Sequence, residues 1–163
     1  DGFDIAIRSH FAALPDSELI QRPMNEEDIT LVAAPTYIAQ RGEPATPQAL
    51  EDHSGLMSSM VTKPWRLSDA TGRTVEVAPR PQLHADESMT LMRAAEAGLG
   101  IVCLPEAISA QGVREGRLVR VLPAWTAGRV RTTILTPHKR GQLPAVRAVI
   151  DFLAQKDATG THP

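Results

Sequence analysis

The sequence has one cysteine, no excess of positive charge and no long apolar run near its start, and each lack removes a class of protein. Cys103 cannot form a disulfide within the chain, which argues against a disulfide-rich secreted scaffold and favours a reducing compartment, the cytoplasm by default. The opening stretch DGFDIAIRSHF has neither the basic region nor the apolar length of a signal peptide or membrane span.

The charge balance disfavours nucleic-acid binding by this chain alone. Lys plus Arg number 17 against 19 for Asp plus Glu, with a formal net charge of -2 and a pI near 6.2. Duplex DNA binding normally needs a basic surface that displaces counterions from the phosphates. We therefore expect any DNA contact to be made by another part of the protein.

What the chain does contain is the composition of a globular protein. Its 163 residues are 42% hydrophobic and 22% charged, and this length can bury the core of one domain or of two small lobes. The chain begins inside an apolar run at residues 5–7, an unusual place for a natural start. We therefore expect it to be a piece of a longer protein.

Apolar patterns and Pro/Gly signals predict alternating strands and helices. A short helix is expected to begin at Pro47, capped by the Thr46 hydroxyl, and further helices at Ser88, Pro105 and Pro144, the last with an apolar face. Residues 11–18 are expected to form a loop, and the predicted strands are 4–8, 29–35, 55–60, 101–104, 118–123 and 130–137, with a hairpin over 65–77. This order predicts an α/β fold with at least partly parallel sheets.

The glycines of Gly98-Leu99-Gly100 do not form a nucleotide-binding fingerprint, because that motif opens a helix and here a helix precedes it. Gly98 instead fits the left-handed residue after a helix, and Gly100 a close approach of two backbones.

Residues that would indicate an enzyme or a metal site are not arranged for it. No Gly-x-Ser-x-Gly elbow is present, and the five histidines never fall at i, i+4 spacing. Cys103 lies in the apolar stretch GIVCLP, which indicates a packed thiol with a raised pKa rather than a nucleophile. We therefore predict no catalytic residue, no metal and no cofactor.

Small polar residues follow several predicted strands and are the remaining candidates for a site. Arg8-Ser9-His10 ends the first strand, Ser58-Ser59 ends another, and residues 85–88 open a helix. In open α/β sheets, ligands bind beyond the carboxyl ends of strands and at helix N-termini. Two plainer interpretations stay open, in which Asp86 or Ser88 only caps the helix and Arg8 only pairs with an acid such as Asp16 or Glu18.

Seven segments together resemble the effector-binding domain of LysR-type transcriptional regulators. Each is weak alone, but their order and spacing are specific over nearly the whole chain. The segments are DIAIR (4–8), LPDSELIQRPM (14–24), LVAAPTYIAQRGEPATPQALEDH (31–53), WRL (65–67), AAEAGLGIVCLP (94–105), GRLVRVLPAW (116–125) and LPAVRAVIDFL (143–153).

This resemblance implies a fold similar to type 2 periplasmic binding proteins, with two α/β lobes joined by two crossing strands and a small organic effector in the cleft between them. The first lobe would comprise residues 1–29 and 131–163, and the second residues 30–130. The resemblance also implies an N-terminally truncated chain that lacks the winged helix-turn-helix, the dimerising linker helix and the start of the first lobe. Operator DNA would be bound through that missing part, by a homodimer or homotetramer.

By position in the family, six residues are expected to line the effector cleft. Relatives commonly have Asn at the position of Asp86, a departure that argues against a plain carboxylate effector at that end. Two rival functions are a stand-alone solute-binding protein of the same fold and an enzyme with an unrecognised site. The six residues are Arg8, Ser9, Ser58, Asp86, Glu87 and Leu104.

Overall fold

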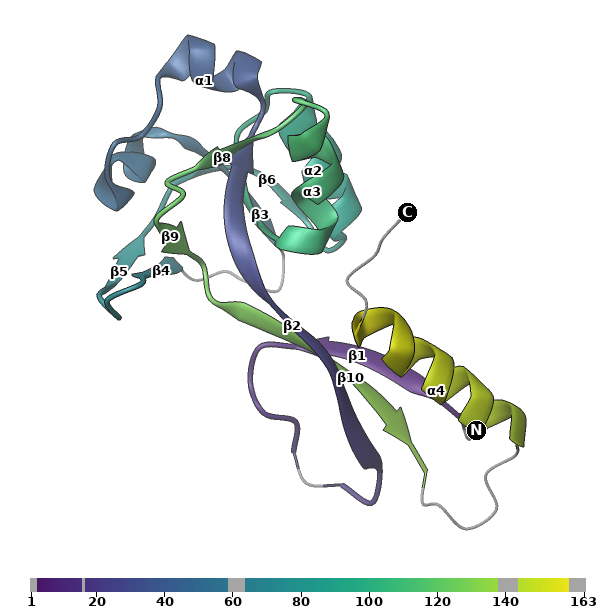
Figure 1. Ribbon diagram of the computed structural model, residues 1–163. Helices are drawn as coiled ribbons and strands as arrows, with labels where there is room; N and C mark the ends of the chain where they lie inside the picture. Colours follow the sequence, from purple (N-terminus) through teal and green to yellow (C-terminus); the bar gives the residue numbers. More distant parts are fainter. Residues whose placement is uncertain (1–2, 16, 59–63, 138–143, 159–163) are drawn as a thin grey trace. The chain divides into compact units, whose positions relative to one another are not determined.

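The computed structural model describes residues 3–15, 17–58, 64–137 and 144–158, with side chains described as far as Leu153 (Figure 1). The chain forms two compact units: unit 1 is Asp1–Glu26 with Val130–Pro163, and unit 2 is Glu27–Arg129. Both boundaries fall inside a strand, the first in β2 (Ile20–Ala33) and the second in β10 (Arg129–Thr136). The chain therefore passes from one unit to the other twice through extended backbone.

The main sheet of unit 2 is mixed, which confirms the predicted α/β class with partly parallel strands. β3 (Ser54–Ser58) lies between β7 (Ile101–Pro105) and β6 (Arg80–Ala85) and runs parallel to both. The second half of β2 pairs antiparallel with β7 on one side and with β8 (Val119–Val121) on the other. The order β2-β7-β3-β6 places parallel strands at the centre of this sheet.

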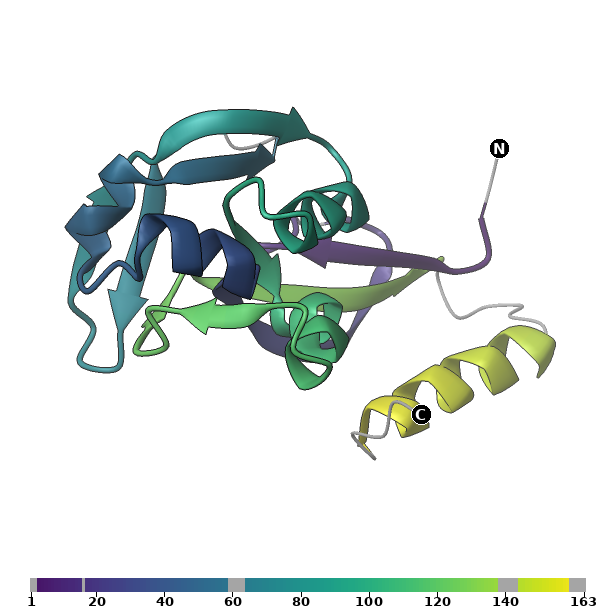
Figure 2. The same ribbon diagram turned by 90° about the horizontal axis from the view of Figure 1, so that it is seen from above.

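Helices α2 (Ser88–Glu96) and α3 (Glu106–Arg114) lie side by side on one face of this sheet (Figures 1 and 2). α2 buries Leu91, Met92 and Ala95 at helical spacing. These side chains pack in one cluster with alternate strand residues such as Val32 and Leu56, since successive residues of a strand point to opposite faces.

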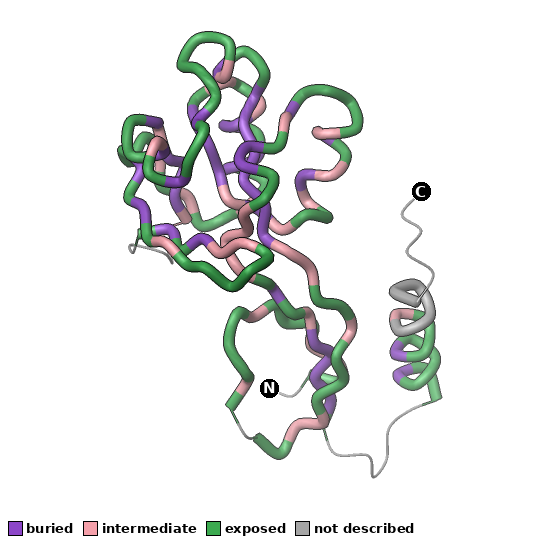
Figure 3. Tube along the Cα trace, turned by 60° about the vertical axis from the view of Figure 1, so that its left-hand side comes forward, coloured by how far each residue is buried: buried purple, intermediate pink, exposed green. Residues whose placement is uncertain are grey.

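The other face of the sheet is covered by α1 (Pro35–Arg41), the 3₁₀ helix η1 (Pro47–Asp52) and a small sheet. That sheet consists of β4 (Trp65–Asp69), β5 (Thr74–Val77) and β9 (Trp125–Thr126), in the order β5-β4-β9. Leu31, Leu50 and Leu67 are at most 1% exposed in the resulting core. Figure 3 shows this burial in purple along the strands of unit 2.

Several local predictions are confirmed. Thr46 Oγ1 accepts a hydrogen bond from Ala49 N at 3.4 Å and so caps η1. The helix that begins at Ser88 ends before Gly98, whose φ of 78° is in the left-handed region. A Cβ on Gly100 would lie 2.5 Å from the Ser54 carbonyl oxygen, so the two backbones do approach closely there.

Other predictions need correction. The first strand is β1 (Ala6–His10), not residues 4–8, and it is not buried, since Ile7 is 54% exposed on the outermost strand of the sheet order. β2 begins at Ile20 rather than near residue 29, because its first half is a half-exposed strand of unit 1 and lacks the apolar run of its second half. The predicted strand over 55–60 is observed to Ser58, and residues 59 and 60 lie outside the described residues.

Unit 1 has a small core between its strands and α4 (Pro144–Ala158). Ile134 of β10 packs with Val146 and Ile150 of α4, as the predicted apolar face of that helix required. β1 pairs antiparallel with β10, and His10 Nε2 lies 2.8 Å from Thr133 Oγ1. The strand pairing and this side-chain contact hold β1 onto β10.

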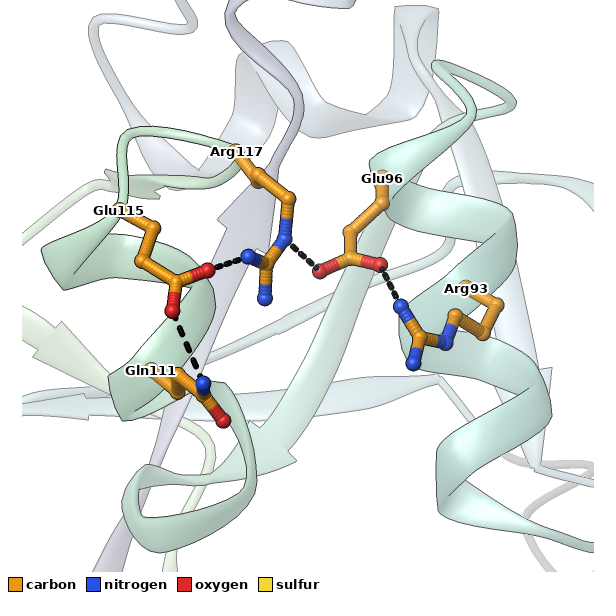
Figure 4. A network of polar contacts seen from close by, with 5 residues as sticks. All are labelled: Arg93, Glu96, Gln111, Glu115 and Arg117. Carbon is orange, nitrogen blue, oxygen red and sulfur yellow. Dashed lines mark hydrogen bonds and ion pairs between the residues drawn. The ribbon is translucent and has the colours of Figure 1, made fainter.

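A charged network joins the C-terminal ends of α2 and α3 (Figure 4). Glu96, whose side chain is only 10% exposed, accepts hydrogen bonds from Arg117 Nε at 2.8 Å and from Arg93 Nη1 at 2.9 Å. Arg117 also pairs with Glu115, which accepts from Gln111. The hydrogen bond from Arg117 is the main reason that the pKa of Glu96 lies below its usual value. The network holds the two helices together at the end opposite their N-termini.

A buried tyrosine and histidine connect α1 to the start of β3. Tyr37 Oη accepts a hydrogen bond from Ser54 N at 2.9 Å and lies 3.2 Å from His53 Nδ1. The hydroxyl proton remains available for Nδ1 when that nitrogen of neutral His53 is unprotonated. His53 is 7% exposed, and desolvation lowers its pKa below 6.5, opposed by Asp52 and aided by Arg41.

We expect His53 to make the stability of the protein fall in mild acid. Because the pKa is lower in the folded than in the unfolded state, the unfolded chain binds the proton first. The contribution is complete above about pH 6.5 and is lost as the pH falls from there towards the folded-state pKa. Urea unfolding between pH 7.5 and 5 should show a steeper loss for the native protein than for His53→Gln. Parallel pH profiles of the two proteins would contradict this.

Candidate functional site

The carboxyl ends of three parallel strands meet at one edge of the unit 2 sheet. Ser58, the last residue of β3, is in register with Ala85 of β6, so Asp86 follows directly beside it. Leu56 is in register with Val102 of β7, and Ser58 and Leu104 each lie two residues further along their parallel strands. The structure therefore brings Ser58, Asp86, Glu87 and Leu104 to a single edge, which we call the carboxyl edge.

Thr30 of β2 belongs to the same edge and was missed by the sequence reasoning. It opposes Leu104 in the antiparallel β2–β7 ladder, so the two side chains share the face that α2 and α3 cover. Thr30 is 1% exposed, and no described residue forms a hydrogen bond with its hydroxyl. In the sequence, Thr30 differs from its neighbours only as the single hydroxyl residue within the apolar run ITLVAA.

Leu104 is itself a core residue. It is 1% exposed and packs in the same cluster as Leu91 of α2 and Val102. Its side chain supports the carboxyl edge from inside unit 2.

The N-terminus of α2 is at this edge, and Glu87 is its N-cap. Glu87 has extended backbone (φ -103°, ψ 125°), and its carboxylate accepts a hydrogen bond from the Thr90 hydroxyl at 3.0 Å. The interpretation that Asp86 or Ser88 caps the helix is therefore wrong, because the helix begins one residue after Glu87 and has no side-chain cap bond. Asp86 is exposed, and no hydrogen bond or ion pair joins it to the described residues.

The N-terminus of α3 lies at the same edge and is occupied by a carboxylate of the chain. Glu27, on β2, accepts a hydrogen bond from Ala107 N through Oε2 at 2.7 Å. An acid at this position satisfies a backbone N–H that the helix leaves unpaired and interacts favourably with the helix dipole. Glu27 therefore acts on α3 as an N-cap side chain would, although it is far from α3 in the sequence.

Replacing Glu27 by Ala is expected to lower the free energy of unfolding by about 1 kcal/mol, as for loss of a helix cap. Glu26→Ala is the matched control, since Glu26 only pairs with Arg131 at 3.2 Å and both side chains are well exposed. That change should cost less than about 0.5 kcal/mol. Equal losses in urea unfolding would show that the Glu27 hydrogen bond contributes nothing of its own.

The two remaining candidates lie in unit 1. Arg8 and Ser9 are exposed residues of β1, in register with Thr133 and Thr132 of β10. Ser9 Oγ lies 3.3 Å from Thr132 Oγ1. Arg8 pairs with no acid of the described residues, and Asp16, one of its expected partners, lies outside them.

Other kinds of site find little support among the described residues. No group of three or more His, Cys, Asp or Glu side chains there could hold a metal ion. Burial raises the pKa of the Cys103 thiol, which keeps it protonated and unreactive. A shallow hollow of about 270 Å³ is lined by Glu43, Pro44, Ala45, Leu122 and Pro123, and none of the six candidate residues lines it. In the described part of the chain, every helix is too short or too polar to cross a membrane.

Parallel strands that end beside two helix N-termini define an α/β protein, and comparison with known proteins identifies the family. The family model of the LysR substrate binding domain matches residues 1–158, and the chain belongs to that family. Its fold is the periplasmic-binding-protein-like fold of LysR-type regulatory domains.

Individual curated relatives support the same family. An HTH-type transcriptional regulator of Xanthomonas campestris is 31% identical over 160 residues, covering 94% of this chain and 45% of that protein. The regulator YhjC of Escherichia coli is 29% identical over 157 residues, covering 94% of this chain and 52% of that protein. The chain thus spans about half the length of the curated relatives that it matches. These relatives are transcriptional regulators rather than enzymes, as predicted.

Solved structures of LysR-type regulators also resemble this chain. The full-length virulence activator AphB of Vibrio cholerae superposes with a TM-score of 0.83 and 29% identity, over 95% of this chain and 52% of AphB. The regulatory domain of CrgA from Neisseria meningitidis superposes with a TM-score of 0.80 and 25% identity, over 94% of this chain and 74% of that domain. The chain is therefore a regulatory, substrate-binding domain of the LysR type.

Proposed function

We propose that this domain senses a small organic effector in a bacterial LysR-type regulator. The effector would bind between a first lobe of residues 1–29 and 131–163 and a second lobe of residues 30–130. The observation that carries the proposal is the convergence of Ser58, Asp86 and Glu87 at the carboxyl edge, over the buried Leu104. Arg8 and Ser9 would contact the effector from the first lobe.

An effector can act only through a difference in affinity. If it binds one arrangement of lobes or subunits better than another, that arrangement becomes more populated, and a few kcal/mol of difference is enough. We propose that the protein is a cytoplasmic homodimer or homotetramer whose DNA-binding domains lie outside this chain. A change of arrangement would then alter how those domains match the spacing of their half-sites on operator DNA.

The test is a ligand-dependent melting screen of the full-length regulator against a library of small metabolites. A true effector at a hundredfold its dissociation constant should stabilise the folded state by roughly 2.7 kcal/mol. The hit should lose affinity in Arg8→Ala and Asp86→Asn, whereas Glu76→Gln, an exposed acid of β5, should bind it normally.

Two results would refute the proposal. One is a library without any stabilising compound. The other is a hit that binds equally well to all three variants, because its site would then lie away from the carboxyl edge.

A further inference from the structure

Helix α1 is held to the rest of unit 2 chiefly through one buried side chain. Of its seven residues, all of which the structure describes, only Tyr37 is buried, and Ile38 packs partly against the same core (Figure 1). The residue before the helix, Ala34, provides no side-chain cap. A helix of two turns is not stable in water by itself, so the position of α1 depends on what Tyr37 contacts.

The Tyr37 hydroxyl contacts a short segment whose backbone is fixed on both sides. Its oxygen accepts a hydrogen bond from Ser54 N at 2.9 Å and lies 3.2 Å from His53 Nδ1, with the two ring centroids 5.8 Å apart. His53 N donates to Leu50 O, and His53 O accepts from Arg80 N, each at 2.9 Å. The histidine backbone is therefore anchored to η1 and to β6, and of the two partners α1 is the one that can move away.

Few charges near His53 can compensate an imidazolium. Asp52, its neighbour on η1, favours the protonated form, but Asp52 is well exposed and already pairs with Arg80 of β6 at 2.9 Å. Arg41, at the end of α1, disfavours that form. β3 carries no titratable residue, and on β5, which packs against η1, the only one is the exposed Glu76. Burial dominates, because His53 is 7% exposed, and this desolvation lowers its pKa.

Protonation also disrupts the hydrogen bonding of the buried hydroxyl. An imidazolium carries a proton on both ring nitrogens, so the Tyr37 O–H cannot donate to Nδ1 of a protonated His53. No other acceptor for this O–H lies among the described residues. With α1 in place, the protonated state combines a buried cation with a buried donor that lacks a partner, and both are costly. Moving α1 away hydrates both groups.

We infer that α1 is an acid-released segment: protonation of His53 opens the contact between His53 and Tyr37, and α1 separates from the start of β3 while the sheet of unit 2 stays folded. This device gives the domain a response to pH that does not depend on the effector site proposed above. In the open state His53 is hydrated and titrates near pH 6.5, whereas in the closed state its pKa is lower. The opening constant of α1 is therefore unaffected well above pH 6.5 and rises as the pH falls below it, by up to about tenfold at pH 5.5.

Hydrogen exchange of the full-length regulator, followed by mass spectrometry at pH 7.5 and 5.5, tests the inference. The informative peptide covers residues 35–42, where Ile38 N and Gly42 N donate to the carbonyls of Ala34 and Ile38. After correction for the intrinsic exchange rate, its opening constant should be about three- to tenfold greater at pH 5.5. At that pH, exchange of this peptide should hardly change in low urea. Exchange of residues 91–96 of α2 should accelerate strongly, because it requires global unfolding.

Two histidine variants provide the matched comparison. His53→Gln removes the titrating group and should abolish the rise between the two pH values. His84→Gln removes an exposed histidine of β6 and should leave the rise intact. Tyr37→Phe keeps the buried ring but removes the hydroxyl, so α1 should open at least about threefold more already at pH 7.5.

Three results would overturn the inference. The first is an α1 peptide that exchanges with the same free energy and urea dependence as α2, since acid would then promote only global unfolding. The second is a pH response that persists in His53→Gln, and the third is a Tyr37→Phe variant whose α1 exchanges as in the native protein. If His53→Gln does not fold, the first and third results still decide, because neither requires that variant. None of these results bears on effector sensing, which the metabolite screen tests separately.

Discussion

Replacing Leu104 by Ala is expected to lower the free energy of unfolding by about 2–5 kcal/mol. Leu104 is 1% exposed and packs against α2 and the centre of the sheet, so the truncation removes buried apolar contacts and leaves a cavity. Both tryptophans, Trp65 and Trp125, lie in unit 2, and their fluorescence during urea unfolding reports on this unit.

Leu99→Ala is the matched control for that experiment. The same side chain is removed, but Leu99 follows α2 and is 46% exposed, so the loss should stay within about 0.5 kcal/mol. If the Leu104 and Leu99 variants unfolded at the same urea concentration, Leu104 would not be the core residue that its burial indicates. Its assignment to a ligand-facing surface would then gain weight.

The second large effect is expected at Gly100. A Cβ there would lie 2.5 Å from the carbonyl oxygen of Ser54, a backbone atom that a side-chain rotation cannot move. β3 is held between β6 and β7, and Ser54 N donates to Tyr37 Oη, so the strand has little room to yield. Gly100→Ala should therefore destabilise the protein by about 3 kcal/mol, the upper end for an overpacked site.

Gly116→Ala separates this steric effect from the general cost of replacing glycine. Gly116 has a φ of 72° and open space around its Cα, so alanine there meets only backbone strain, about 1 kcal/mol. A Gly100→Ala loss no greater than that of Gly116→Ala would mean that β3 and β7 can move apart.

Much of the fold was predictable because the relevant signals are local. The Thr46 cap, the helix that ends before Gly98 and the strand at residues 101–104 follow from side chains within a few positions of each other. Three elements escaped prediction, the two-residue strand β9 among them. β6 contains Pro81 and no apolar run, as an edge strand can, and α1 follows a buried strand with no polar residue before it.

The candidate site was predictable only in part. Ser58, Asp86 and Glu87 were identified because polar residues follow strands, and the structure brings them to one edge. Thr30 and Glu27 could not be found in that way, since both belong to β2, which runs antiparallel and is distant in the sequence. Glu27 caps a helix that begins 79 positions later, after Pro105, and no spacing rule relates two such residues.

The amino-acid sequence alone determined the α/β class, most helix ends and the position of polar residues after strands, because caps, turns and apolar periodicity act over a few residues. Only the tertiary structure decided which of those residues meet. Strand order and register set that outcome, and both depend on packing between segments far apart in the chain. The same packing buried Leu104 and Thr30 and placed Glu27 on the N-terminus of α3.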